Sequence, residues 1–380
     1  MNDALKPASR PRLPLLAVAA AAVFLASATT ASAARDPIAA GTTDLHLKKG
    51  FQRKLANLGA TVQPVGAGTV SGSKIGLAVR DGRFDPTDAQ GFLDTRGGFK
   101  LQLGARGVPV TQLTVNTVKG VVYAKIAKAH MELGTLAAPT TAREGFGANL
   151  KSVKHSLTAK AAQRISNRLG LRGSKRLNPG RVLSNTYATA QPETVTVLPQ
   201  GTATLKADAA TLKKLAEKGV KQQGITAIAP ATKAGAVTFD FPIAGGNLSP
   251  DASKGTLSTA GGVQIAKQGE SLSPTMKLTG VIVDFGAKAA TVELEILPKP
   301  PFPGAAGRTA MVDVVLPGES VTADPLTRTI SVKGAEARLQ AGAASTLNDV
   351  FNQPAPEPPP SSNFVVGDLL GTFSLTAQAQ

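Results

Sequence analysis

The chain has 380 residues, of which 42 are basic, 25 are acidic and none is cysteine. The absence of cysteine excludes disulfide bonds, thiolate metal sites, cysteine nucleophiles and lipid attachment through a cysteine. Apolar residues make up 42% of the chain and aromatic residues only 4%, so a folded core must be built mainly from Val, Leu, Ile and Ala. At about 100–200 residues per domain, the length predicts two or three domains.

Residues 1–33 have the layout of a secretory signal peptide. A basic segment ends at Arg12, an apolar run covers 15–26, and Ala31-Ser32-Ala33 forms a small-residue cleavage site before Ala34. A membrane anchor is the alternative interpretation, but the apolar run is shorter than the about 20 residues that a membrane-spanning helix needs. The sequence therefore predicts a secreted, extracellular protein with no transmembrane span in the mature chain.

The first part of the mature chain predicts one amphipathic helix, then strands, then a second helix. Phe51, Leu55 and Leu58 share one face of a helix, and Gly59 suits its C-terminal cap. The later elements of this part are predicted, in chain order, as strands over 110–115 and 121–126, an Ala-rich helix over 157–169 and a closing strand over 182–189.

Positive charge is concentrated between Arg143 and Arg181. This stretch holds ten basic residues and a single acidic one, Glu144. Three of the basic residues are spaced i, i+4, i+8 on the predicted Ala-rich helix and form one stripe. The candidate polyanion-binding residues are Lys160, Arg164, Arg168, Arg172, Lys175, Arg176 and Arg181.

An internal repeat relates the two halves of the chain. Residues 77–101 align without a gap to residues 241–265, at a constant offset of 164. Four glycines and one proline match in this alignment, which indicates the same turns at the same places, because Gly permits a positive φ and Pro fixes φ. The chain is therefore divided into a signal peptide (1–33), a first copy (34–195) and a second copy (196–380).

The second copy repeats the order of elements seen in the first. Leu212 and Leu215 followed by Gly219 predict its first helix. The remaining elements are predicted as strands over 278–285, 291–297, 311–316 and 329–332, a helix over 341–351, an extended Pro-rich surface loop over 353–363 and a closing strand over 364–376. Short strands with two helices per copy predict an all-β fold of tandem duplicated, β-sandwich-like domains.

The repeated string resembles the HtaA-type domains of secreted and surface proteins for bacterial haem uptake. The resemblance rests on the run Phe241 to Pro250 (FPIAGGNLSP), on Gly255 and on Gly261-Gly262. It also rests on two late segments, 343–351 (AASTLNDVF) and 367–372 (GDLLGT). The resemblance covers most of both copies and implies an HtaA-like fold with haem as the family ligand.

This chain departs from the family at the positions that hold haem. The family pattern has a Trp-Gly pair, then a Phe, then a haem-ligating Tyr three residues later. In copy one Leu45 and His46 stand at the Trp-Gly pair, Phe51 matches the Phe, and Lys54 replaces the Tyr. In copy two the Phe and Tyr positions carry Thr211 and Lys214. The family also has a haem-associated His after the strand that follows the Gly-Gly pair, and neither 103–106 nor 266–269 contains a His.

Other haem ligands are conceivable in copy one. The chain has three histidines, His46, His130 and His155, and no two of them have metal-ligand spacing. His130 lies seven residues after Tyr123, and these two residues are the candidate haem ligands. The competing interpretation is an ordinary strand or loop histidine, since ligand sites usually need several converging groups.

No arrangement of residues points to catalysis or to a metal site. The chain has no G-x-S-x-G nucleophile elbow, so serine catalysis of that type is not indicated. Four aspartates, Asp81, Asp85, Asp88 and Asp94, are spaced as a calcium site or as turn residues that bond their own backbone. Copy two has no aspartate at the matching positions, so turn chemistry is favoured. The sequence predicts a protein that is not an enzyme and has no catalytic or metal-ligating residues.

Charge divides the two copies and indicates a partner. Residues 34–195 hold 24 basic and 9 acidic residues, a net charge of +15, whereas residues 196–380 hold 15 of each. A charge of +15 exceeds the about 2–8 of small domains and favours an anionic partner. Specific nucleic-acid binding is disfavoured because aromatic stacking platforms are missing.

The sequence thus predicts a secreted, non-catalytic binding protein of HtaA type at the bacterial cell envelope. Its alternative role is a structural or adhesive protein of the cell wall that binds anionic polymers through copy one.

Overall fold

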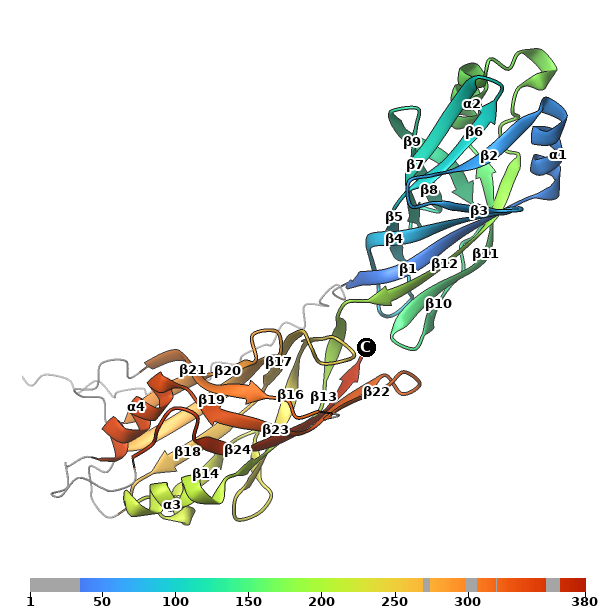
Figure 1. Ribbon diagram of the computed structural model, residues 1–380. Coiled ribbons are helices and arrows are strands. Elements are labelled where there is room, and N and C mark those ends of the chain that lie inside the picture. Colours follow the sequence, from blue (N-terminus) through green and yellow to red (C-terminus); the bar gives the residue numbers. More distant parts are fainter. Residues whose placement is uncertain (1–34, 269–273, 298–305, 319, 353–362) are drawn as a thin grey trace, which may run out of the picture. The chain divides into compact units, whose positions relative to one another are not determined.

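The computed structural model describes residues 35–268, 274–297, 306–318, 320–352 and 363–380 (Figure 1). These residues form two β-rich units with matching strand order, which we name the first barrel and the second barrel. The signal peptide predicted over 1–33 lies outside the described residues, and so does the predicted Pro-rich loop over 353–363 apart from Asn363.

The first barrel extends from Asp36 to Pro192. Its strands are β1 (Asp36–Leu47), β2 (Ala60–Val65), β3 (Thr69–Ser71), β4 (Lys74–Phe84), β5 (Gly91–Thr95), β6 (Gly98–Leu103), β7 (Arg106–Asn116), β8 (Val121–Ile126), β9 (Ala129–Leu136), β10 (Thr141–Glu144), β11 (Gly147–Leu157) and β12 (Val182–Pro192). Its helices are α1 (Lys49–Leu58), α2 (Ala159–Leu169) and the short 3₁₀ helix η1 (Gly173–Lys175).

The second barrel extends from Val195 to Ala379. Its strands are β13 (Val195–Ala207), β14 (Ile225–Ile228), β15 (Thr232–Lys233), β16 (Thr238–Leu248), β17 (Gly255–Thr259), β18 (Gly262–Ala266), β19 (Thr275–Asp284), β20 (Ala289–Leu297), β21 (Ala306–Val315), β22 (Val321–Asp324), β23 (Thr329–Leu339) and β24 (Leu369–Ala379). Its helices are α3 (Ala209–Glu217), α4 (Ala341–Phe351) and the 3₁₀ helix η2 (Gln222–Gly224).

Each sheet closes on itself through eight antiparallel strands. In the first barrel the ring runs β7-β5-β4-β1-β12-β11-β9-β8, and β8 pairs back to β7. The ring of the second barrel is β19-β17-β16-β13-β24-β23-β21-β20, with β20 pairing to β19. The predicted all-β class with tandem domains is confirmed. Closure replaces the two stacked sheets of a sandwich and leaves the ring strands without unpaired edges.

The strand register repeats between the barrels at the offset seen in the sequence. β4 and β16 start and end 164 residues apart, and so do β5 and β17. Gly97 and Gly261 form the turns that follow β5 and β17, with φ of 77° and 79°. A Cβ at Gly97 would lie 2.3 Å from the Gly68 nitrogen, and one at Gly261 would lie 2.4 Å from the Ala231 nitrogen. These positions therefore require glycine both for φ and for space.

The helices begin and end where local capping chemistry places them. Gly59 adopts a left-handed conformation with φ of 71° and ends α1, as predicted. The Ala-rich helix begins at Ala159 rather than at Leu157, because Thr158 is its N-cap and accepts a hydrogen bond from the Ala161 nitrogen at 3.2 Å. Leu157 belongs instead to β11.

The closing strand of the second barrel also differs from its prediction. The sequence predicts a strand over 364–376, whereas β24 covers Leu369–Ala379. The preceding residues form a turn in which the Val365 nitrogen donates to the Asp368 carboxylate at 2.9 Å, and Gly367 has φ of 86°. A positive φ interrupts an extended strand, so pairing starts only after this turn.

Candidate functional site

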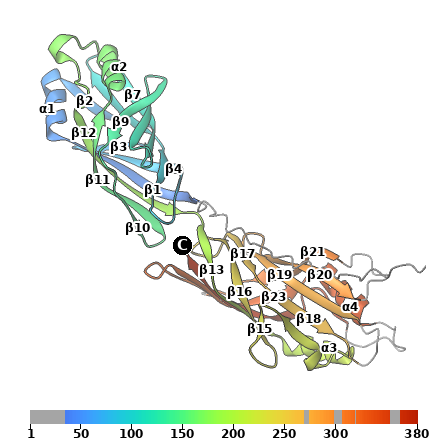
Figure 2. The ribbon, with the colours of Figure 1, turned by 180° about the vertical axis from the view of Figure 1, so that it is seen from behind.

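The two helices of the first barrel lie at the same end of that barrel, as Figures 1 and 2 show from opposite sides. The segment 170–181 after α2 returns to α1: the Lys54 amino group donates to the Ser174 carbonyl oxygen at 2.8 Å, and the Arg181 guanidinium donates to the Gly50 carbonyl oxygen at 2.7 Å. We call this assembly of residues 48–58, 159–169 and 170–181 the basic end.

The basic end carries positive charge without any acidic residue. Seven of its basic residues are exposed, and no salt bridge involves them among the described residues. The exposed set is Lys49, Arg53, Lys160, Arg168, Arg172, Lys175 and Arg176. Like charges held together without counter-charges raise the local positive potential and attract anions.

Two of the predicted polyanion-binding residues are half-buried and bind the protein itself. Arg164 donates from Nε to the Ile126 carbonyl oxygen at 2.9 Å and from Nη2 to the Ala127 carbonyl oxygen at 3.1 Å, so it ties α2 to the end of β8. Arg181 joins the segment 170–181 to α1. The predicted stripe along α2 is therefore reduced to Lys160 and Arg168 as exposed cations.

Sequence reasoning missed Lys49 and Arg53 as members of the same surface. They belong to α1, more than 100 residues from α2 in the sequence. A sequence signal was present, because the whole stretch 48–80 contains no acidic residue. Only the fold brings α1, at the start of this stretch, beside 170–181.

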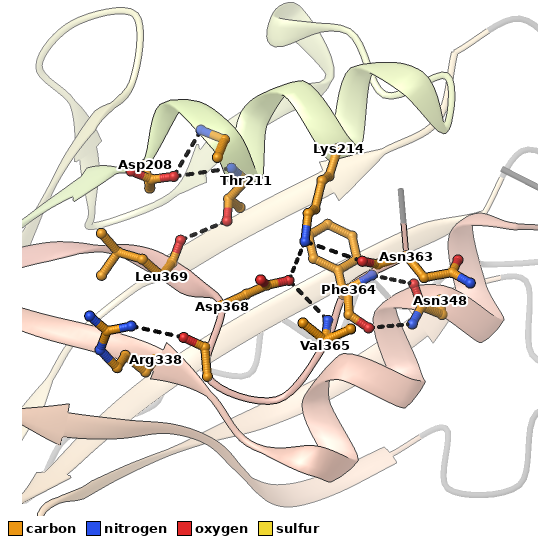
Figure 3. Close-up of polar contacts among 12 residues, drawn as sticks. Asp208, Thr211, Lys214, Arg338, Asn348, Asn363, Phe364, Val365, Asp368 and Leu369 are labelled. Carbon is orange, nitrogen blue, oxygen red and sulfur yellow. Dashed lines mark hydrogen bonds and ion pairs between the residues drawn. The ribbon is translucent and has the colours of Figure 1, made fainter. Parts of the chain in front are cut away.

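The two lysines that the resemblance aligns with the haem-ligating tyrosine of HtaA-type domains both bond within their own barrel. In the first barrel, Lys54 holds the segment 170–181. In the second, Lys214 lies 2.5 Å from the Asp368 carboxylate, 3.2 Å from the Asn363 carbonyl oxygen and above the Phe364 ring (Figure 3). Burial opposes ionisation of Asp368, but the hydrogen bonds from Lys214 and from the Val365 nitrogen, together with the charge of Lys214, outweigh it and lower the pKa of that carboxyl.

Other residues at the family's haem positions are also occupied by packing or hydrogen bonds. Leu45 is buried, and His46 packs against Tyr187 with ring centroids 4.7 Å apart. Thr211 donates to the Leu369 carbonyl oxygen at 2.7 Å (Figure 3). Phe51 is 1% exposed and belongs to the core of the first barrel.

Tyr123 and His130 are brought together by the β8–β9 hairpin. Their ring centroids are 6.0 Å apart and their planes differ by 10°. Tyr123 is half-buried and His130 is exposed, while the neighbouring Val122 and Ala124 are fully buried. Since side chains alternate along a strand, the Tyr123–His130 pair lies on the outer face of the barrel. Their role as haem ligands stays a prediction.

The aspartates considered as a calcium site are used in local turns or in a contact between strands. Asp85 accepts from the Thr87 nitrogen and Asp88 from the Gln90 nitrogen, both at 2.8 Å. Asp94 accepts from the Thr114 hydroxyl. The Asp85 and Asp88 bonds are turn contacts that short acidic side chains commonly make, whereas the Asp94 bond joins β5 to β7. The described residues contain no cluster of His, Asp and Glu suited to hold a metal ion.

His155 is the one histidine of the described chain that is fully buried. Its Nδ1 lies 3.4 Å from the Ser184 hydroxyl, and its Nε2 has no hydrogen-bond partner. Burial lowers the pKa of His155 to about 4. The imidazole is therefore neutral at pH 7 and belongs to the core. Within the described part of the chain, no helix is both long enough and apolar enough to span a membrane.

Comparison with known proteins finds no protein family that matches this chain and no curated protein that matches its sequence. Three solved structures from Corynebacterium glutamicum align with parts of it. The C-terminal domain of HtaA aligns at 14% identity over 41% of this chain and 98% of that domain, with a TM-score of 0.34. The N-terminal domain of HtaA aligns at 13% identity over 41% and 98%, with a TM-score of 0.30. The heme-binding protein HtaB aligns at 12% identity over 49% and 95%, with a TM-score of 0.28.

Two of these three structures are domains of HtaA. At such identities and TM-scores they assign neither a family nor a ligand to this chain. Its function has to be read from its own side chains.

Proposed function

We propose that this protein is a secreted, non-catalytic binding protein that attaches to an anionic polymer of the bacterial cell envelope through the basic end of its first barrel. The observation that carries the proposal is the seven exposed cations on α1, α2 and 170–181, with no acidic residue on these elements. Secretion is proposed from the signal-peptide pattern of residues 1–33.

A polymer of repeated negative charges suits this surface better than a lipid bilayer or a single-stranded nucleic acid. Among the described residues, the large apolar side chains that are exposed, such as Val118 and Leu326, all lie outside the basic end. Insertion into a bilayer needs an apolar face. The one aromatic residue of the basic end, Phe51, is buried. The bases of a single-stranded nucleic acid therefore have no ring on which to stack.

The test is binding of the mature protein to inorganic polyphosphate, a phosphate polymer with regularly spaced charges. We expect saturable binding whose affinity falls steeply between about 50 and 200 mM salt, because each neutralised phosphate releases counterions. The variant Arg53→Gln/Arg168→Gln/Arg172→Gln/Lys175→Gln removes four exposed cations and is expected to weaken binding by on the order of 1,000-fold, at roughly 1 kcal/mol per cation.

A matched control removes four exposed lysines from the second barrel: Lys213→Gln/Lys221→Gln/Lys288→Gln/Lys333→Gln. Both variants have the same net charge, so the control separates a localised surface from a general charge effect. Equal loss of binding in the two variants, or binding that ignores salt, would refute the basic end as the site. Tighter binding to anionic vesicles than to polyphosphate would redirect the proposal to lipid.

A second candidate function is haem binding through Tyr123 and His130, which the hairpin places 6.0 Å apart. Tyr and His are both haem ligands in proteins. Titration of the mature protein with hemin is expected to give a saturable, stoichiometric Soret shift that Tyr123→Phe and His130→Ala each alter. His46→Ala is the control substitution. A flat titration, or a spectrum unchanged by both substitutions, would remove this candidate.

A further inference from the structure

The interior of the second barrel contains a cavity of about 150 Å³. Its walls come from most strands of the ring and from α3, with Phe239, Val263, Met311 and Phe373 among the lining residues. The lining side chains are aliphatic or aromatic apart from three threonines, and none is charged. The cavity is therefore an apolar pocket inside the barrel that is partly open rather than fully enclosed.

The polar atoms of the wall are already satisfied. Thr204 donates to the Asp240 carboxylate at 2.6 Å, Thr211 to the Leu369 carbonyl oxygen at 2.7 Å, and Thr259 to the Val281 carbonyl oxygen at 3.5 Å. No buried polar side-chain atom without a hydrogen bond lines the cavity among the described residues. A buried water needs about two to four polar partners, and the wall offers none that is free, so it favours an apolar occupant over an ordered water.

The cavity arises from smaller side chains at positions that the first barrel fills. Val263 takes the place of Phe99, and Thr211 that of Phe51, at the offsets of the repeat. Phe51 and Phe99 are each 1% exposed in the first barrel. Ala207 likewise replaces Leu47, and Ala337 replaces His155. The second barrel does gain Phe239, Phe241 and Phe373, but these rings form part of the cavity wall.

We infer that the interior of the second barrel binds a small hydrocarbon group, either as a free molecule of about benzene size or as the end of an alkyl chain. Cavities of about 150 Å³ with aliphatic and aromatic walls stay dry and admit benzene. The volume is below the about 300–1,000 Å³ of pockets that enclose drug-sized ligands, so a whole haem does not fit. Leu212 and Leu370 line the cavity and are half-buried, which points to entry beside α3.

This inference is independent of the basic end and can be tested in the mature protein by NMR of ¹³C-labelled methionine methyl groups. Met311 lines the cavity, and Met131 lies in the first barrel as an internal control. Titration with benzene is expected to shift the Met311 methyl resonance saturably and to leave that of Met131 unchanged. A parallel titration with octanoate distinguishes a free small molecule from the end of an alkyl chain. A Met311 shift with octanoate that matches the shift with benzene indicates that the cavity takes the end of an alkyl chain.

Filling the cavity provides the matched variants. Val263→Phe restores the ring found at Phe99 and is expected to abolish the benzene-induced shift and to raise the melting temperature by about 2–4 °C. Ala207→Leu restores the side chain found at Leu47 and serves if Val263→Phe does not fold. The inference is overturned if neither probe shifts Met311 saturably, or if the shift persists in the filled variants.

Discussion

The two barrels share one strand order but differ in the packing of their interiors and in the charge at their helical ends. The first barrel has a packed interior and a helical end with only basic charges. The second has an interior cavity and a helical end where Lys214 is paired with Asp368. A closed sheet fixes which side chains point inward and which point outward. After duplication, the inward-facing and the outward-facing side chains of each barrel can therefore change while the strand order stays the same. In this chain, side chains on a constant ring therefore set both the surface charge and the interior packing.

The largest expected effect concerns the packed interior of the first barrel. Phe51→Thr places the residue of the second barrel, Thr211, at the matching position. Truncating a buried Phe costs about 3–5 kcal/mol, because apolar contacts are lost and a cavity remains. Both tyrosines of the chain, Tyr123 and Tyr187, lie in the first barrel, and there is no tryptophan. Urea unfolding followed by tyrosine fluorescence therefore reports this barrel alone. A loss below about 1 kcal/mol would mean that Phe51 does not fill the interior.

The second prediction concerns His155, which the second barrel replaces by Ala337. Burial lowers its pKa to about 4 in the folded state, from an ordinary value of 6.5. The unfolded chain therefore binds the proton first, so the stabilising contribution is complete above pH 6.5 and is lost as the pH falls toward 4. The loss is on the order of 3 kcal/mol. Urea unfolding by tyrosine fluorescence at pH 7.5 and pH 4.5 measures it.

The control for this pH effect is His155→Leu, which has no titrating group at the site. Its stability should lack the part of the pH dependence that is due to His155. An unchanged pH dependence in the variant would assign the acid sensitivity to other groups.

The third prediction separates the structural and the exposed arginines of α2. Arg164→Met removes two charge-assisted hydrogen bonds to the end of β8 and is expected to cost about 1–3 kcal/mol. Arg168→Met on the exposed face is expected to change stability by less than about 0.5 kcal/mol but to weaken polyphosphate binding. The second barrel has Thr346 in place of Arg164, bonded to its own helix at the Gly342 carbonyl oxygen. Equal stability losses in Arg164→Met and Arg168→Met would contradict the distinction between a structural and an exposed arginine.

The smallest expected effect concerns the lysine that replaces the family tyrosine. Lys214→Met breaks a half-buried ion pair and is expected to cost about 1–2 kcal/mol, whereas Lys54→Met removes one bond to a carbonyl and should cost about 1 kcal/mol or less. Because the pKa of Asp368 is lowered, its contribution is present above the unfolded pKa and is lost as the pH falls through the folded value. The Met276 methyl resonance can follow unfolding of the second barrel. A loss of stability in Lys54→Met as large as that in Lys214→Met would contradict the expected difference between the two lysines.

Much of the fold could be predicted from the sequence alone. The gapless match of 77–101 with 241–265 places the strands and turns of both barrels in the same register, because turn glycines act locally. The predicted helix over 341–351 agrees with α4, and the predicted strand over 121–126 agrees with β8. The strand β1 was not predicted from the sequence, because Gly, Ala and Thr interrupt the alternation of apolar residues that is typical of a strand.

Some features of the candidate sites likewise follow from the sequence, and others only from the tertiary structure. Composition and charge counts along the chain determined that copy one is basic and copy two neutral. The resemblance to HtaA-type domains predicted from residue identities that the haem ligands of those domains are replaced. Tertiary structure alone decided that α1 joins α2 and 170–181 in one surface, that Arg164 is bonded to carbonyl groups, and that the second barrel contains an apolar cavity. The physical reason is that charge and turn propensity belong to residues and their near neighbours, whereas surface potential and packing depend on pairs far apart in the chain that meet only when the sheet closes.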